Sequence, residues 1–155
     1  LETGNYILKQ EDFIIPVEVP EALNMLKRQN YLLIVITNQG GIAEGLYSRE
    51  QMHHFHQIIQ VKTNHSIDAF YYSPYREKFS ASLVHKPGTL LFEKAIAKFG
   101  IDVLKSWMIG DKERDIIAGK LVGVRTILIS SEKTIESDYH STDLLSATRI
   151  IMANP

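Results

Sequence analysis

The sequence contains no cysteine. Disulfide frameworks, cysteine-ligated zinc, iron–sulfur clusters and thiol nucleophiles are therefore excluded. The sequence also lacks an excess of either charge, since it has 17 basic and 18 acidic residues. This balance does not favour a broad nucleic-acid-binding surface. No apolar run approaches the roughly 20 residues that span a bilayer, and no signal-peptide pattern stands at the start. We expect a cytoplasmic protein that binds neither nucleic acid nor membrane.

The residues that are present fit one globular domain. The chain has 155 residues, of which 45% are hydrophobic and 23% charged. A chain of this length can bury about two-thirds of its unfolded surface. Because no linker-like segment or internal repeat divides the sequence, we expect a single domain over residues 1–155, and we expect it to be monomeric.

Apolar runs of strand length alternate with amphipathic segments, which predicts an α/β fold with a parallel sheet. Ser48 with Gln51 predicts a capped helix start, and Gly100 and Gly123 predict helix ends. Beyond Ser130 the chain is polar up to its last helix. The predicted strands are 31–37, 67–72, 106–109 and 124–129, and the predicted helices are 20–29, 48–64, 88–99, 111–121 and 142–152.

Polar groups follow the first of these strands in the run Thr37-Asn38-Gln39-Gly40-Gly41. Sites in open parallel sheets lie at the carboxyl ends of strands. A hydroxyl and backbone N–H groups there could bind a phosphate oxyanion, since the two glycines let the backbone turn toward it. The alternative is a glycine turn in which Thr37 binds its own backbone.

A lysine stands before the helix predicted at 88–99, in His85-Lys86-Pro87-Gly88. Helix N-termini attract anions and repel cations, so a lysine there makes sense if an anion lies between the two. The alternative is an exposed lysine with its ammonium in water.

Two carboxylates open the helix predicted at 111–121, in Gly110-Asp111-Lys112-Glu113-Arg114-Asp115. Asp111 and Asp115 are four residues apart and are expected to share a helix face. They could be ordinary partners of the helix dipole. Combined with Thr37 and Lys86, however, they predict Mg²⁺-assisted phosphoryl transfer, because Mg²⁺ takes one or two carboxylates plus phosphate oxygens and waters.

Taken together, these motifs resemble motifs II, III and IV of the haloacid dehalogenase superfamily. Asn5-Tyr6, the extension of the first motif to Gly45, and Phe70-Tyr-Tyr-Ser-Pro74 are similar to the branch that holds heptose-bisphosphate phosphatases and histidinol-phosphate phosphatases. The likeness runs from about Gly4 to Ile129. It implies a Rossmann-like, three-layer, doubly wound sheet, and the stretch before Lys86 is too short for a large cap domain.

The resemblance also implies roles. Thr37, helped by the Asn38 amide, would bind the phosphoryl oxygen, and Lys86 would bridge phosphate and nucleophile; both are expected catalytic residues. Asp111 would bind Mg²⁺, with Asp115 supporting that ligand or Lys86. The expected substrate-binding residues are Thr37, Asn38, Gln39, Lys86 and Lys112, and the expected metal ligands are Asp111 and Asp115.

Three departures from the family pattern stand out. The cysteine-containing zinc loop of heptose-type members is absent, so no zinc is expected. His85 stands where such members tend to carry Arg. The superfamily's first motif, Asp-x-Asp, is missing, because the aspartates are at 12, 68, 102, 111, 115, 138 and 143.

In this fold the first motif ends a central strand, between those at 31–37 and 106–109. Without it both neighbours would leave buried backbone groups unpaired, at roughly 1–3 kcal/mol each. Since the first residue is Leu rather than Met, we expect a further N-terminal segment that carries this strand.

We therefore expect Mg²⁺-dependent hydrolysis of a small phosphate monoester, such as a sugar phosphate, through an aspartyl-phosphate intermediate. Histidinol-phosphate or a polynucleotide 3′-phosphate is the alternative substrate for the same machinery. A non-catalytic phosphate-binding scaffold, or one segment of a larger protein, is the alternative from another class. Separately, His53, His54 and His56 are expected to lie on a solvated helix face.

Overall fold

The computed structural model describes residues 14–75, 83–84, 86–131 and 136–155. Asn5, Tyr6, Asp12 and His85, which the sequence analysis singled out, lie outside these ranges. Within them the elements follow the predicted alternation of helices and strands. Their bounds are α1 (Glu18–Arg28), β1 (Ile34–Asn38), α2 (Gly40–Ala43), α3 (Arg49–Lys62), β2 (Ala69–Ser73), α4 (Leu90–Phe99), η3 (Val103–Lys105), β3 (Trp107–Gly110), α5 (Glu113–Val122), β4 (Arg125–Ile129), β5 (Tyr139–Ser141) and α6 (Leu144–Ala153).

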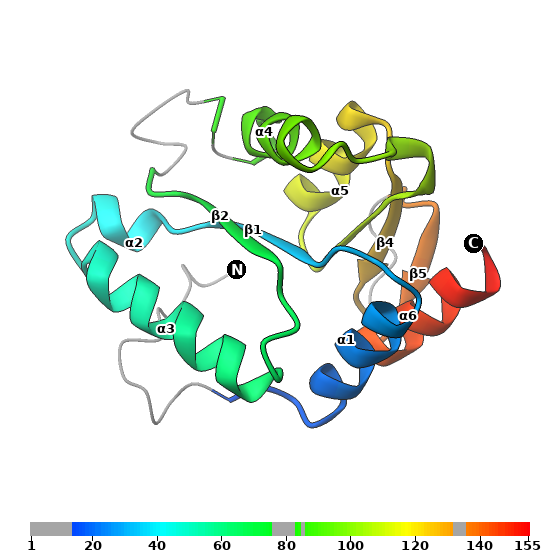
Figure 1. The fold of residues 1–155 in the computed structure, drawn as a ribbon. Coiled ribbons are helices and arrows are strands. Elements are labelled where there is room, and N and C mark those ends of the chain that lie inside the picture. Colours follow the sequence, from blue (N-terminus) through cyan, green and yellow to red (C-terminus); the bar gives the residue numbers. More distant parts are fainter. Residues whose placement is uncertain (1–13, 76–82, 85, 132–135) are drawn as a thin grey trace.

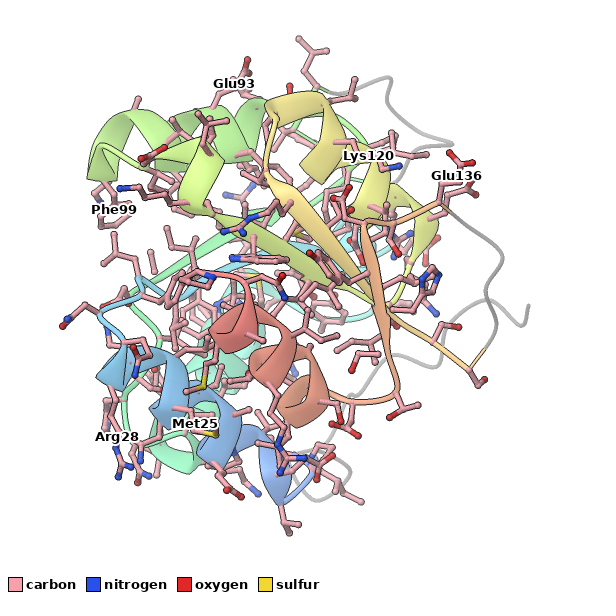
Figure 2. All side chains as sticks on the ribbon, turned by 90° about the vertical axis from the view of Figure 1, so that its right-hand side faces the viewer. Met25, Arg28, Glu93, Phe99, Lys120 and Glu136 are labelled. Atoms are coloured by element: carbon pink, nitrogen blue, oxygen red, sulfur yellow. The ribbon has the colours of Figure 1, made fainter. Side chains whose placement is uncertain are left out.

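Helices cover both faces of the strands. In Figure 1, α4 and α5 lie above β1 and β2, whereas α1, α3 and α6 lie below them. Figure 2, turned by a quarter, again places α1 beside α6, and these two helices pack against each other. The labelled Glu93 and Lys120 lie on the outer sides of α4 and α5. The molecule therefore has the three-layer α/β arrangement expected from the sequence.

All strand pairs among the described residues are parallel, but they form two sheets. β1 pairs with β2, with Thr37 opposite Tyr72 and Asn38 opposite Ser73. The second sheet has the order β3-β4-β5. Within the described ranges, β1 and β3 are therefore edge strands of separate sheets. A core cluster of Leu26, Ile127, Ala147 and Ile151 joins α1, β4 and α6.

Local signals explain several helix ends. The Ser48 hydroxyl accepts from the Gln51 N–H, and the Gln51 side chain accepts from the Ser48 N–H, which completes the predicted capping box. Gly100 and Gly123 take left-handed φ values of 60° and 86° after α4 and α5. These two glycines end their helices in a conformation that side-chain-bearing residues rarely adopt.

The tail beyond Ser130 contains a strand that the sequence did not predict. β5 is only three residues long and polar, and it is paired to the edge of β4. The carboxylate of Asp138, directly before it, accepts from both the N–H and the hydroxyl of Thr126, at 2.7 and 2.8 Å. β5 therefore forms through its pairing with β4, and no apolar run in the sequence predicts it.

His56 is not on a solvated face, and that expectation was wrong. Its side chain is buried and stacks on Phe70 of β2, with ring centroids 4.3 Å apart. Burial, helped by the neighbouring charge of His53, lowers the pKa of His56 from 6.5 to about 4. The neutral imidazole is therefore part of the packing between α3 and β2.

In the part of the chain that the structure describes, no helix is long and apolar enough to cross a membrane.

Candidate phosphate site

The residues at the carboxyl end of β1 are held by a chain of side-chain hydrogen bonds. The backbone N–H of Gln39 donates to the Ser73 carbonyl at 2.7 Å, which continues the pairing of β1 with β2 past Asn38. The Gln39 side chain donates from Nε2 to Thr37 Oγ1 at 3.2 Å, and its Oε1 accepts from the Tyr47 hydroxyl at 2.5 Å. Gln39, expected to bind substrate, therefore contacts Thr37 directly.

Asn38 connects the end of β1 to the segment before α4. Its Oδ1 accepts from the backbone N–H of Lys86 at 3.0 Å, and its Nδ2 donates to the Lys86 carbonyl at 3.3 Å. These two hydrogen bonds, which we call the Asn38 clasp, fix the main chain of Lys86 beside the strand end. The clasp thereby brings together two motifs that are 48 residues apart.

The ammonium of Lys86 is buried rather than in water. Its side chain is 8% exposed and lies 2.5 Å from Asp115 Oδ1, whose side chain is 6% exposed. Lys86 Nζ also donates to the Ile36 carbonyl at 2.8 Å. Ile36 directly precedes Thr37, so the positive charge is held at the backbone of β1 near its carboxyl end.

Asp115 uses its second oxygen to cap α5. Its Oδ2 accepts from the backbone N–H of Lys112 at 3.1 Å. The helix dipole also stabilises a negative charge at this position. Gly110 makes room for this carboxylate, because a Cβ added at Gly110 would lie 2.6 Å from Asp115 Oδ2 and 2.3 Å from Asp115 Cβ. Both Asp115 oxygens are thus engaged, one with Lys86 and the other with the helix start.

Asp111 lies outside the helix, so the expectation that it shares a helix face with Asp115 was wrong. The helix begins at Glu113, with Lys112 as its N-cap, and the loop turns Asp111 toward solvent. The Asp111 side chain is 66% exposed, and its Oδ2 lies 3.4 Å from the Lys112 ammonium. Asp111 is therefore the accessible carboxylate of the expected pair.

The residues fit a magnesium ion only in part. Among the residues that the structure describes, no three or more His, Cys, Asp or Glu side chains gather closely enough to hold a metal ion. Mg²⁺, however, commonly keeps several waters and takes one or two carboxylates together with phosphate oxygens. The exposed Asp111 could supply one such carboxylate, whereas Asp115 is engaged with Lys86 and the start of α5.

The structure places the seven expected site residues in two groups of contacts that meet at the end of β1. Thr37 and Gln39 contact each other. Asn38 contacts Lys86, which pairs with Asp115; Asp115 accepts from the Lys112 N–H, and Lys112 pairs with Asp111. Sequence reasoning missed Tyr47. Its place directly before the N-cap Ser48 is where an apolar residue often packs onto the helix, and that pattern predicts burial but not a hydroxyl contact.

Comparisons with known proteins agree on one family. The family model described as HAD-hydrolase-like matches residues 84–151. A D-glycero-beta-D-manno-heptose-1,7-bisphosphate 7-phosphatase from Haemophilus ducreyi is 31% identical over 146 residues, which cover 86% of this chain and 79% of that protein. The enzyme of the same name from Pasteurella multocida is 35% identical over 132 residues, covering 76% and 69%.

A solved structure has the same fold. The D,D-heptose 1,7-bisphosphate phosphatase from B. bronchiseptica, complexed with magnesium and phosphate, superposes with a TM-score of 0.82 at 17% identity. The match covers 94% of this chain and 87% of that one.

Proposed function

Because this chain belongs to the haloacid dehalogenase-like hydrolases and is a phosphatase of that family, we propose that it removes phosphate from a small phosphorylated sugar with the help of Mg²⁺. The relatives' names point to heptose bisphosphate as the substrate class. The proposal includes a monomeric enzyme in the cytoplasm, as expected from the sequence.

The observation that carries this proposal is the buried ammonium of Lys86, which is held at the Ile36 carbonyl directly before Thr37. An ammonium has three N–H donors. One binds the Ile36 carbonyl, and the charge is paired with Asp115. We assign a remaining donor to a phosphoryl oxygen. A buried charge acts in a low local dielectric, where it stabilises developing negative charge more strongly than it would in water.

Thr37 complements Lys86 in this assignment. Its Oγ1 accepts from Gln39 Nε2, so the hydroxyl proton is available for a second phosphoryl oxygen. Asn38 fixes the main chain of Lys86 through the clasp. Lys112, exposed at the start of α5, is the residue that we assign to the rest of the substrate.

Asp111 is the residue that we assign to Mg²⁺. The fit rests on its exposed carboxylate at the carboxyl end of β3, and the solved relative complexed with magnesium and phosphate supports the same pair of ligands here. When bound, Mg²⁺ would neutralise charge on the phosphoryl group. Asp115 would act instead as the counter-ion that keeps Lys86 in place.

The nucleophile, in this proposal, is an aspartate outside the 155 residues. The sequence has no Asp-x-Asp pair, and Asp115 is committed to Lys86 and the helix start. The separation of the described strands into β1-β2 and β3-β4-β5 supports an added strand between β1 and β3 that would aim this pair at the site. The first carboxylate would attack phosphorus, the second would protonate the leaving oxygen, and water would then release phosphate from the acyl phosphate.

The alternative is a phosphate-binding domain without catalysis, and the absent Asp-x-Asp pair favours it for the 155 residues alone. Loss of general acid help costs roughly 10²–10⁴ in rate, and loss of the nucleophile costs more. We therefore expect this chain by itself to turn over very slowly.

One experiment tests the proposal and separates the two candidates. Phosphate release is measured with Mg²⁺ on a panel of sugar phosphates, histidinol-phosphate and a 3′-phosphorylated oligonucleotide. The 155-residue chain, verified by intact mass, is compared with the protein encoded by the gene including any upstream codons. Turnover of sugar phosphates by the longer protein alone is the expected result. Brisk turnover by the 17.6 kDa chain would refute the missing nucleophile, and turnover by neither would favour the scaffold.

A further inference from the structure

Tyr47 is a buried tyrosine whose hydroxyl points at the phosphate site rather than at solvent. It stands between α2 and α3, is 8% exposed, and donates to Gln39 Oε1 at 2.5 Å. Gln39 in turn donates to Thr37 Oγ1 at 3.2 Å. The three side chains therefore form a relay that ends on the hydroxyl assigned to the phosphoryl group.

The direction of these hydrogen bonds decides where the Thr37 proton goes. With Gln39 Oε1 held by the Tyr47 hydroxyl, the Nε2 side of the amide faces Thr37 and donates to it. The Thr37 hydroxyl then acts as an acceptor toward Gln39 and keeps its own proton for an anion. If the amide were reversed, the Thr37 hydroxyl would donate its hydrogen bond to Gln39 Oε1. Thr37 would then present only lone pairs to a phosphoryl oxygen.

Gly41 makes the space that Tyr47 occupies. A Cβ added at Gly41 would lie 2.2 Å from Cε1 of the Tyr47 ring, a distance that no packed atom pair sustains. Gly41 is a helical residue of α2 and is not among the residues with positive φ. Its backbone would therefore accept alanine, and it is the Tyr47 ring that requires glycine at this position.

We propose that Tyr47 is a positioning residue of the phosphate site: by fixing the orientation of the Gln39 amide, it holds the Thr37 hydroxyl as a donor to the phosphoryl oxygen. This inference rests on the proposed function, because it assumes that Thr37 binds phosphate. It adds a residue from outside the motifs and gives Gln39 a supporting part through Thr37.

A double-mutant cycle between Tyr47 and Thr37 tests the inference. Affinity for inorganic phosphate is measured by calorimetry with Mg²⁺ present, a readout that needs no turnover. Tyr47→Phe removes one oxygen and should weaken phosphate binding roughly two- to tenfold, the range that corresponds to one hydrogen bond. In a Thr37→Ala background the same change should have almost no effect, because the hydroxyl through which Tyr47 acts is gone.

Tyr139→Phe is the matched control, since it deletes a hydroxyl that donates to Asn154 Oδ1 at the C-terminal helix and should leave phosphate affinity unchanged. Gly41→Ala provides a second route, because displacing the ring should weaken binding as Tyr47→Phe does. Equal losses from Tyr47→Phe in both backgrounds, or no loss while Thr37→Ala lowers affinity, would overturn the inference alone. Unchanged affinity in Thr37→Ala itself would overturn the phosphate site and the inference together.

Discussion

The side-chain amide of Asn38 binds the main chain of Lys86 at both of its polar groups, with the Lys86 N–H donating to Oδ1 and the Lys86 carbonyl accepting from Nδ2. An amide side chain thereby does what a neighbouring strand does, because it pairs an N–H and a C=O at once. The position of the Lys86 backbone is consequently set by the end of β1 rather than by α4, which begins only at Leu90.

Asn38→Ala should therefore loosen Lys86 without removing any charge. We expect the free energy of unfolding to fall by about 1–3 kcal/mol, since two part-buried backbone groups lose their partners, and phosphate affinity to fall as well. Urea denaturation and calorimetry with inorganic phosphate measure the two effects. Asn24→Ala, an exposed change within α1, is the control. Full phosphate affinity in the Asn38 variant would show that the clasp does not position Lys86.

Removing one partner of the Lys86–Asp115 pair should lower the free energy of unfolding far more than replacing both partners with apolar residues. Asp115→Ala leaves a buried ammonium without its counter-ion, and removal of one partner from a buried pair typically costs about 3–5 kcal/mol. The double variant Lys86→Met, Asp115→Leu removes both charges and should regain most of that loss, apart from about 1 kcal/mol for the cap on α5. Urea denaturation of both variants measures their free energies of unfolding and tests this expectation. A double variant no more stable than Asp115→Ala would contradict a charge-based explanation.

Asp111→Asn should lose most of its Mg²⁺ affinity and stay folded, because the Asp111 side chain is exposed and pairs with the neighbouring Lys112. Calorimetric titration with Mg²⁺ in the presence of inorganic phosphate measures the affinity, and a thermal melt checks the fold. Glu113→Gln removes an exposed acid two residues away and should bind Mg²⁺ almost normally. The assignment fails if the two variants bind the ion equally well.

Stability should decline in mildly acidic solution because of His56. Its pKa is about 4 in the folded protein and 6.5 when exposed, so between these values the unfolded chain binds the proton more readily. The contribution of the neutral imidazole is complete above pH 6.5 and shrinks as the pH falls toward 4. Linkage gives a loss of about 2 kcal/mol by pH 5 and about 3 kcal/mol in total.

Urea denaturation at pH 7 and pH 5 measures this effect. A His56→Leu variant should lose less stability over the interval than the unmodified chain, whereas His54→Gln, changed at an exposed position of the same helix, should lose as much. If His56→Leu shows the same pH dependence as the unmodified chain, other groups are responsible.

Local patterns in the sequence predicted the elements that local interactions form. Ser48 with Gln51 marked the start of α3, and Gly100 and Gly123 marked helix ends, because caps and left-handed turns depend on a few consecutive residues. His56 could have been found in the same way. It falls on the same face as Met52 of α3 and Thr63 at the C-cap, spaced by four and seven residues, and both of these are buried.

Long-range contacts were beyond such patterns. β5 exists because β4 offers a free edge, and its polar residues carry no strand signal of their own. The motifs at Thr37, Lys86 and Asp111 were found as separate runs, and the common strand-end position predicted their meeting. Which atoms meet depends on tertiary packing, so neither the Asn38 clasp nor the Tyr47 hydroxyl could be predicted.

The missing side chain of Gly110 has a consequence for how this sequence can change over generations. Asp115 fills the space in which a Cβ at position 110 would stand, so any larger residue there must first displace the carboxylate that neutralises Lys86. The nearest atom is the Asp115 Cβ, at 2.3 Å, and every residue except glycine carries that atom at position 115. An apolar side chain in place of the carboxylate therefore leaves the clash in place. Glycine at 110 is required as long as position 115 keeps a side chain, so the two positions constrain each other during sequence change.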